Sequence, residues 1–194
     1  MIPGLILAAG RSTRMGRSKA LLTLPRSGLT FVAEIAATLL AGGVADALIV
    51  GRPEDRALRD EVERLPGRVR FVENLRAETG QLSSVQAGLN VADHPGTRGI
   101  LVTPVDLPLI DSSTVAALLA AFASSSCPIV RAVHAGRHGH PVIFGRAVFD
   151  ALRRGDLEAG ARAVVRSFPV LDLEVADTGV LHDIDTPDDY SRLS

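Results

Sequence analysis

The chain has 194 residues, 46% of them hydrophobic, with a formal net charge of −1 and a pI near 6.5. This balance excludes the globally basic surface that recruits nucleic acid, and no stretch approaches the roughly 18 apolar residues of a membrane span. The single cysteine, Cys127, cannot form an intramolecular disulfide. The first apolar run has its cations after it, unlike a secretory signal peptide, so we expect a cytoplasmic protein.

Short apolar runs alternate with helical patterns over the first two thirds of the chain. The runs predict strands at 4–9, 45–51, 69–74, 99–106 and 127–133. They lack polar alternation, which is typical of parallel strands covered on both faces. Apolar residues at three- and four-residue spacing predict helices at 30–43, 53–65, 80–92 and 111–123. This order predicts an α/β fold, a three-layer α/β/α sandwich with a mainly parallel, Rossmann-like sheet.

The pattern changes after residue 134. Residues 134–145 predict a loop and a short strand, and 155–168 a loop followed by a helix. Alternation at 170–175 predicts an exposed strand, and 179–193 a strand, a turn at Pro187 and a short helix. No internal repeat or linker interrupts the chain, so we expect a single domain over residues 1–194.

The stretch "LILAAGRSTRMGRSKALL" (5–22) combines a strand, a glycine turn and a helix start. Four cations lie on it with no Asp or Glu among them: Arg11, Arg14, Arg17 and Lys19. Such a turn directs backbone N–H groups at an anion, and Gly10 and Gly16 permit close approach. The spacing excludes a Walker A loop and the dinucleotide fingerprint. The turn predicts another kind of phosphate loop, or alternatively a solvated basic face.

Acidic residues follow two predicted strands. Asp106 ends the strand at 99–106, where ligands bind in open α/β sheets, and Asp183 and Asp185 alternate near the C-terminus. One carboxylate from each segment would hold Mg²⁺. The alternatives are an ordinary turn aspartate at 106 and a helix-opening aspartate at 185. His138 and His140 form an H-x-H that lacks a third zinc ligand at suitable spacing.

The stretch "LAAGRSTRMGRSK" fits L-A-A-G-x-S-x-R-M-G-x-x-K and resembles the signature of MobA-like NTP transferases such as molybdenum cofactor cytidylyltransferase. Further matches occur in the family's order: "GQLSSVQAGL" (80–89), "VTPVDLPLI" (102–110), "GRHGHPVIFGR" (136–146), "GDLEAGARAVV" (155–165) and "DIDTPDDY" (183–190). The resemblance implies a fold of the nucleotide-diphospho-sugar transferase type. It also implies Mg²⁺-dependent, or Mn²⁺-dependent, transfer of CMP from CTP to molybdopterin-bound molybdenum, with release of pyrophosphate.

The resemblance also assigns site residues. The catalytic set is Arg14, Lys19, Asp106 and Asp185. The nucleotide-binding set is Leu7, Ala8, Ala9, Gly10, Arg11, Ser12, Gly16, Lys19, Gly80, Ser83, Ser84 and Asp106, with Ser83 or Ser84 contacting the base. The acceptor-binding set is His138, Gly139, His140, Pro141, Gly160 and Ala161. The metal ligands are Asp106 and Asp185, with Asp183 as the alternative to Asp185.

The pair Ala8–Ala9 predicts which nucleotide base the protein prefers. Relatives that use GTP resemble this signature but read L-A-G-G, so a Cβ at Ala9 predicts a preference for a pyrimidine. The expected partners are CTP or another NTP, a molybdopterin-type acceptor and a molybdoenzyme or insertion chaperone that receives the product. The alternatives are guanylyl or other nucleotidyl transfer to a different acceptor, and a non-catalytic nucleotide-binding accessory protein.

Overall fold

The computed structural model describes residues 1–11, 15–16 and 18–193 and contains a seven-stranded sheet of order β3-β2-β1-β4-β6-β5-β7. The strands are β1 (Gly4–Leu7), β2 (Ala47–Gly51), β3 (Val69–Glu73), β4 (Gly99–Pro104), β5 (Ile129–His134), β6 (Arg137–Gly145) and β7 (Val170–Glu174). Strand β6 runs antiparallel to β4 and β5, and the other pairings are parallel. The predicted fold class is confirmed.

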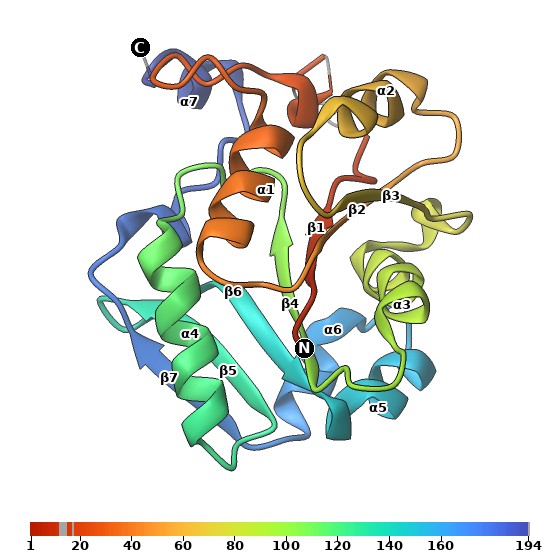
Figure 1. Cartoon of the computed structure of the whole chain (residues 1–194), viewed down its shortest axis with the longest axis vertical. Coiled ribbons are helices and arrows are strands. Elements are labelled where there is room, and N and C mark those ends of the chain that lie inside the picture. The colour runs from red at the N-terminus through yellow and green to blue at the C-terminus, as the bar shows by residue number, and fades with distance from the viewer. Residues whose placement is uncertain (12–14, 17, 194) are drawn as a thin grey trace.

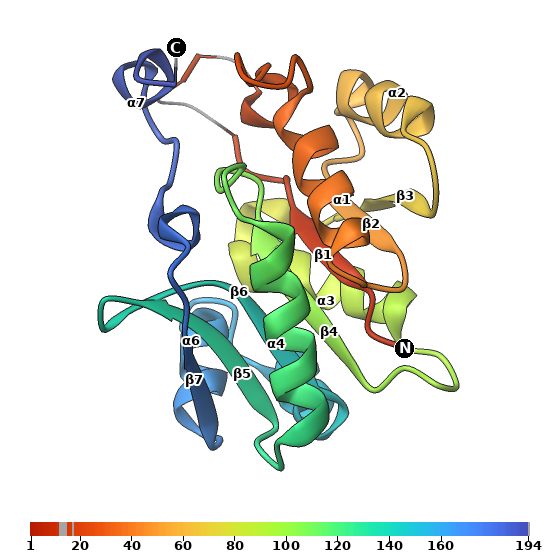
Figure 2. The same cartoon turned by 60° about the vertical axis from the view of Figure 1, so that its left-hand side comes forward.

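Helices cover both faces of this sheet (Figures 1 and 2). One face carries α1 (Phe31–Ala41), α2 (Arg56–Arg64) and α4 (Ser112–Ser124), and the other α3 (Gln81–Ala92), α5 (Phe149–Arg154) and α6 (Gly160–Arg166). The short elements are α7 (Pro187–Ser191) and the 3-10 helices η1 (Lys19–Leu21), η2 (Ala77–Thr79), η3 (Arg146–Val148) and η4 (Thr178–Leu181). Among the described residues, none of the helices has the length and apolar character that crossing a membrane requires.

Each central strand contributes to two apolar cores. In β1, Ile6 packs on the α1 and α4 side, whereas Leu5 and Leu7 pack on the α3 side. Strand β4 repeats this division, with Leu101 on the first side and Ile100 on the second. Alternate side chains of a strand point to opposite faces, so a doubly covered strand is apolar at every position. This explains why the central predicted strands lack polar alternation, whereas the edge strand β3 exposes Arg70 and Glu73.

The C-terminal third departs from the sequence-based expectation in three places. Residues 137–145 form one nine-residue strand, β6, rather than a loop and a short strand. Strand β6 is followed by η3 and α5, which the pattern did not predict. The predicted strand at the start of 179–193 is absent from the described chain, and Pro187 opens α7 instead of forming a turn.

The missing strand has a local cause at its first residues. The carboxylate of Asp177 accepts a hydrogen bond from the Gly179 N–H at 2.8 Å, which turns the chain into η4. Gly179 also packs against the backbone of Leu109 so closely that a Cβ would collide with it. Further on, the Ile184 N–H donates to the carbonyl of Asp106 at 2.8 Å. The segment is therefore held by contacts with the β4–α4 connection rather than by a sheet ladder.

Candidate active site

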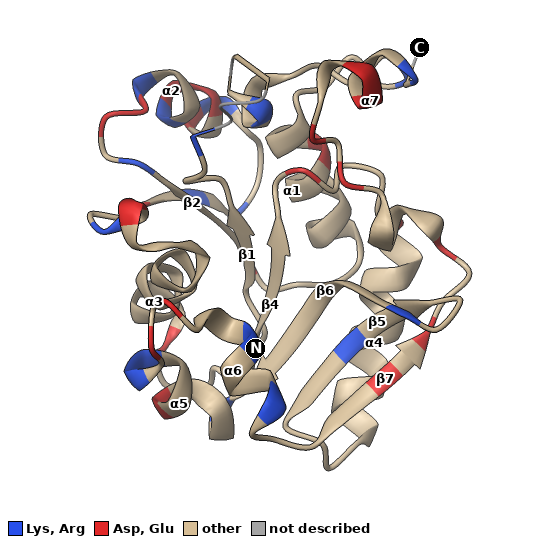
Figure 3. Ribbon diagram, turned by 180° about the vertical axis from the view of Figure 1, so that it is seen from behind, with Lys and Arg blue, Asp and Glu red and all other residues tan. Residues whose placement is uncertain are grey.

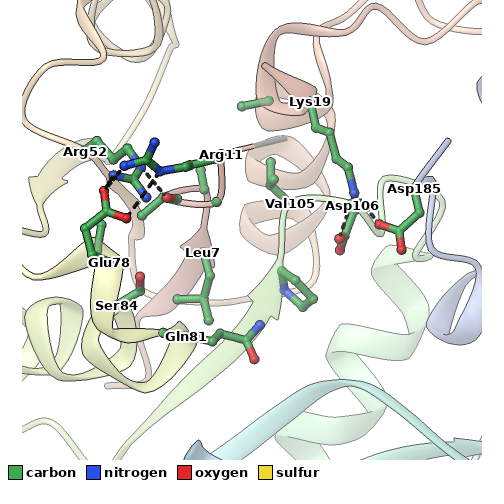
Figure 4. Close-up of a pocket in the computed structure, with 17 residues that line it drawn as sticks. Leu7, Arg11, Lys19, Arg52, Glu78, Gln81, Ser84, Val105, Asp106 and Asp185 are labelled. Carbon is green, nitrogen blue, oxygen red and sulfur yellow. Dashed lines mark hydrogen bonds and ion pairs between the residues drawn. The ribbon is translucent and has the colours of Figure 1, made fainter. Parts of the chain in front are cut away.

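A cavity of about 450 Å³ opens at the carboxyl ends of β1 and β4 (Figure 4). These neighbouring strands lie where the sheet order reverses direction, the usual ligand position in open α/β sheets. The walls come from the turn after β1, the end of β2, the start of α3 and the loop after β4. The lining residues include Leu7, Ala8, Ala9, Gly10, Arg11, Lys19, Arg52, Ala77, Glu78, Gly80, Gln81, Ser84, Pro104, Val105, Asp106 and Asp185.

At one end of the cavity, a lysine lies between two aspartates. The Lys19 Nζ donates to Asp106 Oδ2 at 3.4 Å and also to Asp185 Oδ1. Lys19 is buried, and the backbone bond from Ile184 to Asp106 holds the two acidic segments side by side. Figure 3 shows acidic positions gathered at this end of β4 and before α7. Because one ammonium reaches both carboxylates, the two are close enough to share a single cation.

The donor atoms at this end suit a hard divalent cation. Asp106 Oδ1 is buried, and among the described residues it has no hydrogen-bond partner. A buried carboxylate oxygen without a partner is costly, and Mg²⁺ or Mn²⁺ prefers such oxygens. The described residues contain no cluster of three or more potential ligands. If Asp106 and Asp185 held the cation, water and phosphate oxygens would fill its remaining coordination positions.

Asp183 adds negative charge beside this centre. Its side chain is exposed at the surface, yet partial desolvation and the charges of Asp106 and Asp185 raise the pKa of its carboxyl. Lys19 is hydrogen-bonded to Asp185, not to Asp183, within the described contacts. Asp185 is thus the carboxylate that lies with Asp106 at Lys19, and its role as second metal ligand stays a prediction.

At the other end of the cavity, Glu78 lies between two arginines. Arg11 donates to its carboxylate through Nη2 at 2.6 Å and Nε at 3.2 Å, and Arg52 through Nη1 at 2.5 Å. These hydrogen bonds lower the pKa of Glu78 to about 2. Glu78, Arg52 and Gln81 also line the cavity and were not predicted from the sequence. The position of Arg52 directly after a parallel strand was the only local signal for its role.

The glycine turn is partly described. Leu7, Ala8, Ala9, Gly10 and Arg11 line the cavity, and their role in nucleotide binding stays a prediction. Gly16 has a φ of +66°, which suits glycine, but it is not among the lining residues. The predicted sites Ser12 and Arg14 lie outside the described residues, as does Arg17.

The two predicted base-contacting serines differ in position. Ser84 lines the cavity, whereas Ser83 is buried behind it and donates its hydroxyl to the Gly80 carbonyl at 2.7 Å. Asn74 donates through Nδ2 to both hydroxyl oxygens, at 2.8 Å to Ser83 and 3.0 Å to Ser84. The expectation for Ser83 therefore does not match its position, because its hydroxyl already serves the start of α3. Ser84 is the serine that a ligand can reach.

Asn74 is expected to stabilise this wall measurably. Asn74→Ala removes the donors for two buried hydroxyls, which should lower the free energy of unfolding by about 1–3 kcal/mol. Denaturant unfolding measures this loss. The chain's other asparagine, Asn90, is exposed on α3, the helix that carries Ser83 and Ser84, and supplies the control. Asn90→Ala should leave stability unchanged or slightly raised, and equal losses in both variants would contradict the role given to Asn74.

The residues predicted to bind the acceptor do not line the cavity. His138, Gly139, His140 and Pro141 lie in β6, and Gly160 and Ala161 begin α6. Their grouping around a second substrate stays a prediction.

The β6 residues nevertheless have defined surroundings. His138 Nε2 is 3.5 Å from Asp172, and Gly139 packs against the Val180 carbonyl so closely that a Cβ would collide with it. Burial lowers the pKa of His140, although the charge of Asp106 partly opposes the shift. His140 is thus neutral near pH 7 and would contact an anion only through a hydrogen bond.

Residues 4–174 match the MobA-like NTP transferase domain. The chain belongs to this family. This MobA-like chain is 33% identical to nicotine blue oxidoreductase of Paenarthrobacter nicotinovorans, across 99% of the chain and 96% of that protein. It is 31% identical to the purine catabolism protein PucB of Bacillus subtilis, across 98% of the chain and 94% of that protein. A probable molybdenum cofactor guanylyltransferase of Opitutus terrae is 36% identical over 58% of the chain and 51% of its own length.

Solved structures share the fold of this chain. Rv0371c of Mycobacterium tuberculosis superposes with a TM-score of 0.82 at 29% identity and covers 100% of this chain and 97% of its own. Rv0371c has also been solved in complex with manganese, with a TM-score of 0.78 to this chain. The MobA-like chain is thus a nucleotidyltransferase by family and by fold.

Proposed function

We propose that this protein transfers CMP from CTP to the phosphate of molybdopterin-bound molybdenum cofactor and releases pyrophosphate. The observation that carries the proposal is the joint contact of Lys19 with Asp106 and Asp185 at the end of the cavity. A cation-binding pair of carboxylates beside a glycine turn is what nucleotidyl transfer requires. The family membership and the molybdenum cofactor guanylyltransferases among the relatives support the reaction class and the acceptor.

The chemistry needs little acid–base assistance. The acceptor phosphate is already ionised near neutral pH, and its oxygen bonds to the α-phosphorus as the bond to the pyrophosphate oxygen breaks. The main barrier is the approach of two anions, so positioning and charge neutralisation carry the reaction. Lys19 would supply a fixed positive charge, and backbone N–H groups of the turn at Gly10 would donate hydrogen bonds to the phosphates. Asp106 and Asp185 would hold Mg²⁺ or Mn²⁺, which supplies charge neutralisation at the phosphates.

The base assignment depends on the wall formed by Ala9. Ala9 is 5% exposed and lines the cavity, so its Cβ occupies space that glycine would leave open. Because the Ala9 Cβ narrows the cavity, the smaller base cytosine is favoured over guanine. Guanylyl transfer is the second candidate, since curated relatives carry that name. A non-catalytic binding role is disfavoured because it would not require two carboxylates at the end of the cavity.

The decisive experiment supplies each NTP with Mg²⁺ and molybdenum cofactor and measures released pyrophosphate. We expect the wild type to prefer CTP over GTP by about 10–200-fold, the range of steric discrimination by a small group. Ala9→Gly should lower that preference by opening the wall. A wild-type preference for GTP would overturn the base assignment. A CTP preference that Ala9→Gly leaves untouched would overturn the explanation from Ala9 alone.

A further inference from the structure

An ion-pair bridge joins two walls of the cavity. We propose that Arg52 and Glu78 are positioning residues that fix the separation between the turn at Ala9 and the start of α3, and thereby set base selectivity. This inference rests on the proposed function, because it concerns where the base would bind. Figure 4 shows both side chains on the opposite side of the cavity from Lys19, Asp106 and Asp185.

Arg52 is hydrogen-bonded to the backbone of the first wall, the turn at Ala9. It follows β2, which pairs with β1, and its Nε donates to the Ala9 carbonyl at 2.8 Å. Its side chain is only 15% exposed, so few alternative positions are open to it. Its Nη1 donates at the same time to Glu78 Oε1 at 2.5 Å. The planar guanidinium has several donors in fixed directions, so one side chain bonds both walls.

Glu78 belongs to the second wall, which is formed by η2 and the start of α3. It lies in η2, two residues before Gly80, where α3 begins. Its second arginine, Arg11, comes from the turn after β1, so the carboxylate is bonded twice to the opposite wall. The hydrogen bonds that lower its pKa to about 2 keep Glu78 ionised at neutral pH. The bridge therefore persists across the working pH range of an enzyme.

Loss of the bridge would loosen this wall without unfolding it. The loop before α3 keeps a separate attachment, since Arg76 bonds through its N–H to Asn74 Oδ1 at 2.9 Å and through Nη2 to Gln86 at 2.8 Å. Without Glu78, both arginine contacts are lost, and without Arg52 only the exposed Arg11–Glu78 pair still joins the Ala9 turn to η2. In either case the two walls could separate further. A wider space admits the larger purine, so selectivity should fall while the fold persists.

The test measures dissociation constants and KM and kcat for CTP and GTP, each with Mg²⁺, in Arg52→Met, Arg52→Lys and Glu78→Gln. We expect Arg52→Met to lower the CTP-to-GTP preference about tenfold, within the range of steric discrimination. Arg52→Lys should not restore it, because a single ammonium lacks the fork that reaches both partners. Glu78→Gln should have a smaller effect in the same direction, since an amide oxygen still accepts a hydrogen bond.

Glu73→Gln is the matched control. Glu73 ends β3 and pairs with Arg59 at 2.5 Å, and neither residue lines the cavity. We expect this variant to keep the wild-type ratio. Thermal unfolding of all variants checks that they remain folded, and Glu78 is exposed enough for its substitution to be tolerated.

The possible results separate the inference from the proposed function. A merely structural role would weaken CTP and GTP binding equally, and an unchanged ratio in Arg52→Met and Glu78→Gln would overturn the inference. If Glu78 merely competes with triphosphate for Arg11, Glu78→Gln will tighten both nucleotides equally, which also overturns it. Failure of the wild type to bind either nucleotide, or to release pyrophosphate with molybdenum cofactor, would instead overturn the proposed function.

Discussion

Alanine at Asp106 or Asp185 is expected to abolish most nucleotidyl transfer while the chain stays folded. Each carboxylate bonds Lys19 and lines the cavity, so each variant removes one of the two acidic groups that the described residues place on Lys19. The loss should be on the order of 10²–10³-fold in kcat, as for other charge-stabilising groups. Pyrophosphate release at saturating nucleotide and Mg²⁺ measures it.

The alanine substitutions at Asp106 and Asp185 should lower stability less than they lower activity. Asp106 and Asp185 side chains are 26% and 30% exposed, so their removal leaves no large buried cavity. Asp106→Ala also removes a buried oxygen that has no hydrogen-bond partner among the described residues, which offsets part of the lost ion pair. Asp46→Asn is the control, because Asp46 pairs with Arg70 at 2.8 Å away from the cavity. Near-wild-type turnover in both alanine variants would exclude the two-aspartate site.

Lys19→Met is expected to lose activity and to change how the protein responds to divalent cations. The substitution leaves Asp106 and Asp185 facing each other without the ammonium between them. We expect a loss of roughly 1–3 kcal/mol in unfolding free energy with EDTA, below the 3–5 kcal/mol for breaking a fully buried pair. Mg²⁺ or Mn²⁺ should then raise the unfolding temperature more in Lys19→Met than in the wild type, because no ammonium competes.

Two comparisons make this prediction specific. Lys19→Arg should not restore turnover, since a planar guanidinium does not replace a compact ammonium between two carboxylates. Asp106→Ala should lose the cation-dependent increase in unfolding temperature. An identical response to Mg²⁺ in the wild type, Lys19→Met and Asp106→Ala would show that the cation binds elsewhere.

The first two thirds of the fold followed closely from local pattern. Apolar runs predicted β1 to β5, and helical spacing predicted α1 to α4. The central strands β1, β2 and β4 are buried on both faces, which requires the continuous apolar runs that the sequence contains. The C-terminal third was less predictable. Strand β6 contains Gly139 and Pro141, residues that usually mark turns, and residues 179–185 follow contacts from Asp177 and to Asp106 rather than their own alternation.

In the candidate site, too, some residues could be predicted from the sequence and others could not. Asp106 was predictable from its position at the end of a parallel strand. The sequence left Asp183 and Asp185 as alternatives, and only the tertiary structure shows Asp185 in contact with Lys19 beside Asp106. Ser83 and Ser84 were not distinguishable by sequence, because only the position of Asn74 and the start of α3 decides which hydroxyl faces the cavity. Arg52 and Glu78 carried no motif at all.

By itself, the sequence determined that a doubly covered parallel sheet presents a glycine turn rich in cations. Both features arise from neighbours along the chain: apolar runs and closely spaced glycines and basic residues. Only the tertiary structure decided which charges those cations meet. Arg11 pairs with a carboxylate 67 positions away, and Lys19 with carboxylates 87 and 166 positions away. Coulomb attraction depends on distance in space and on burial, and neither can be calculated from sequence separation.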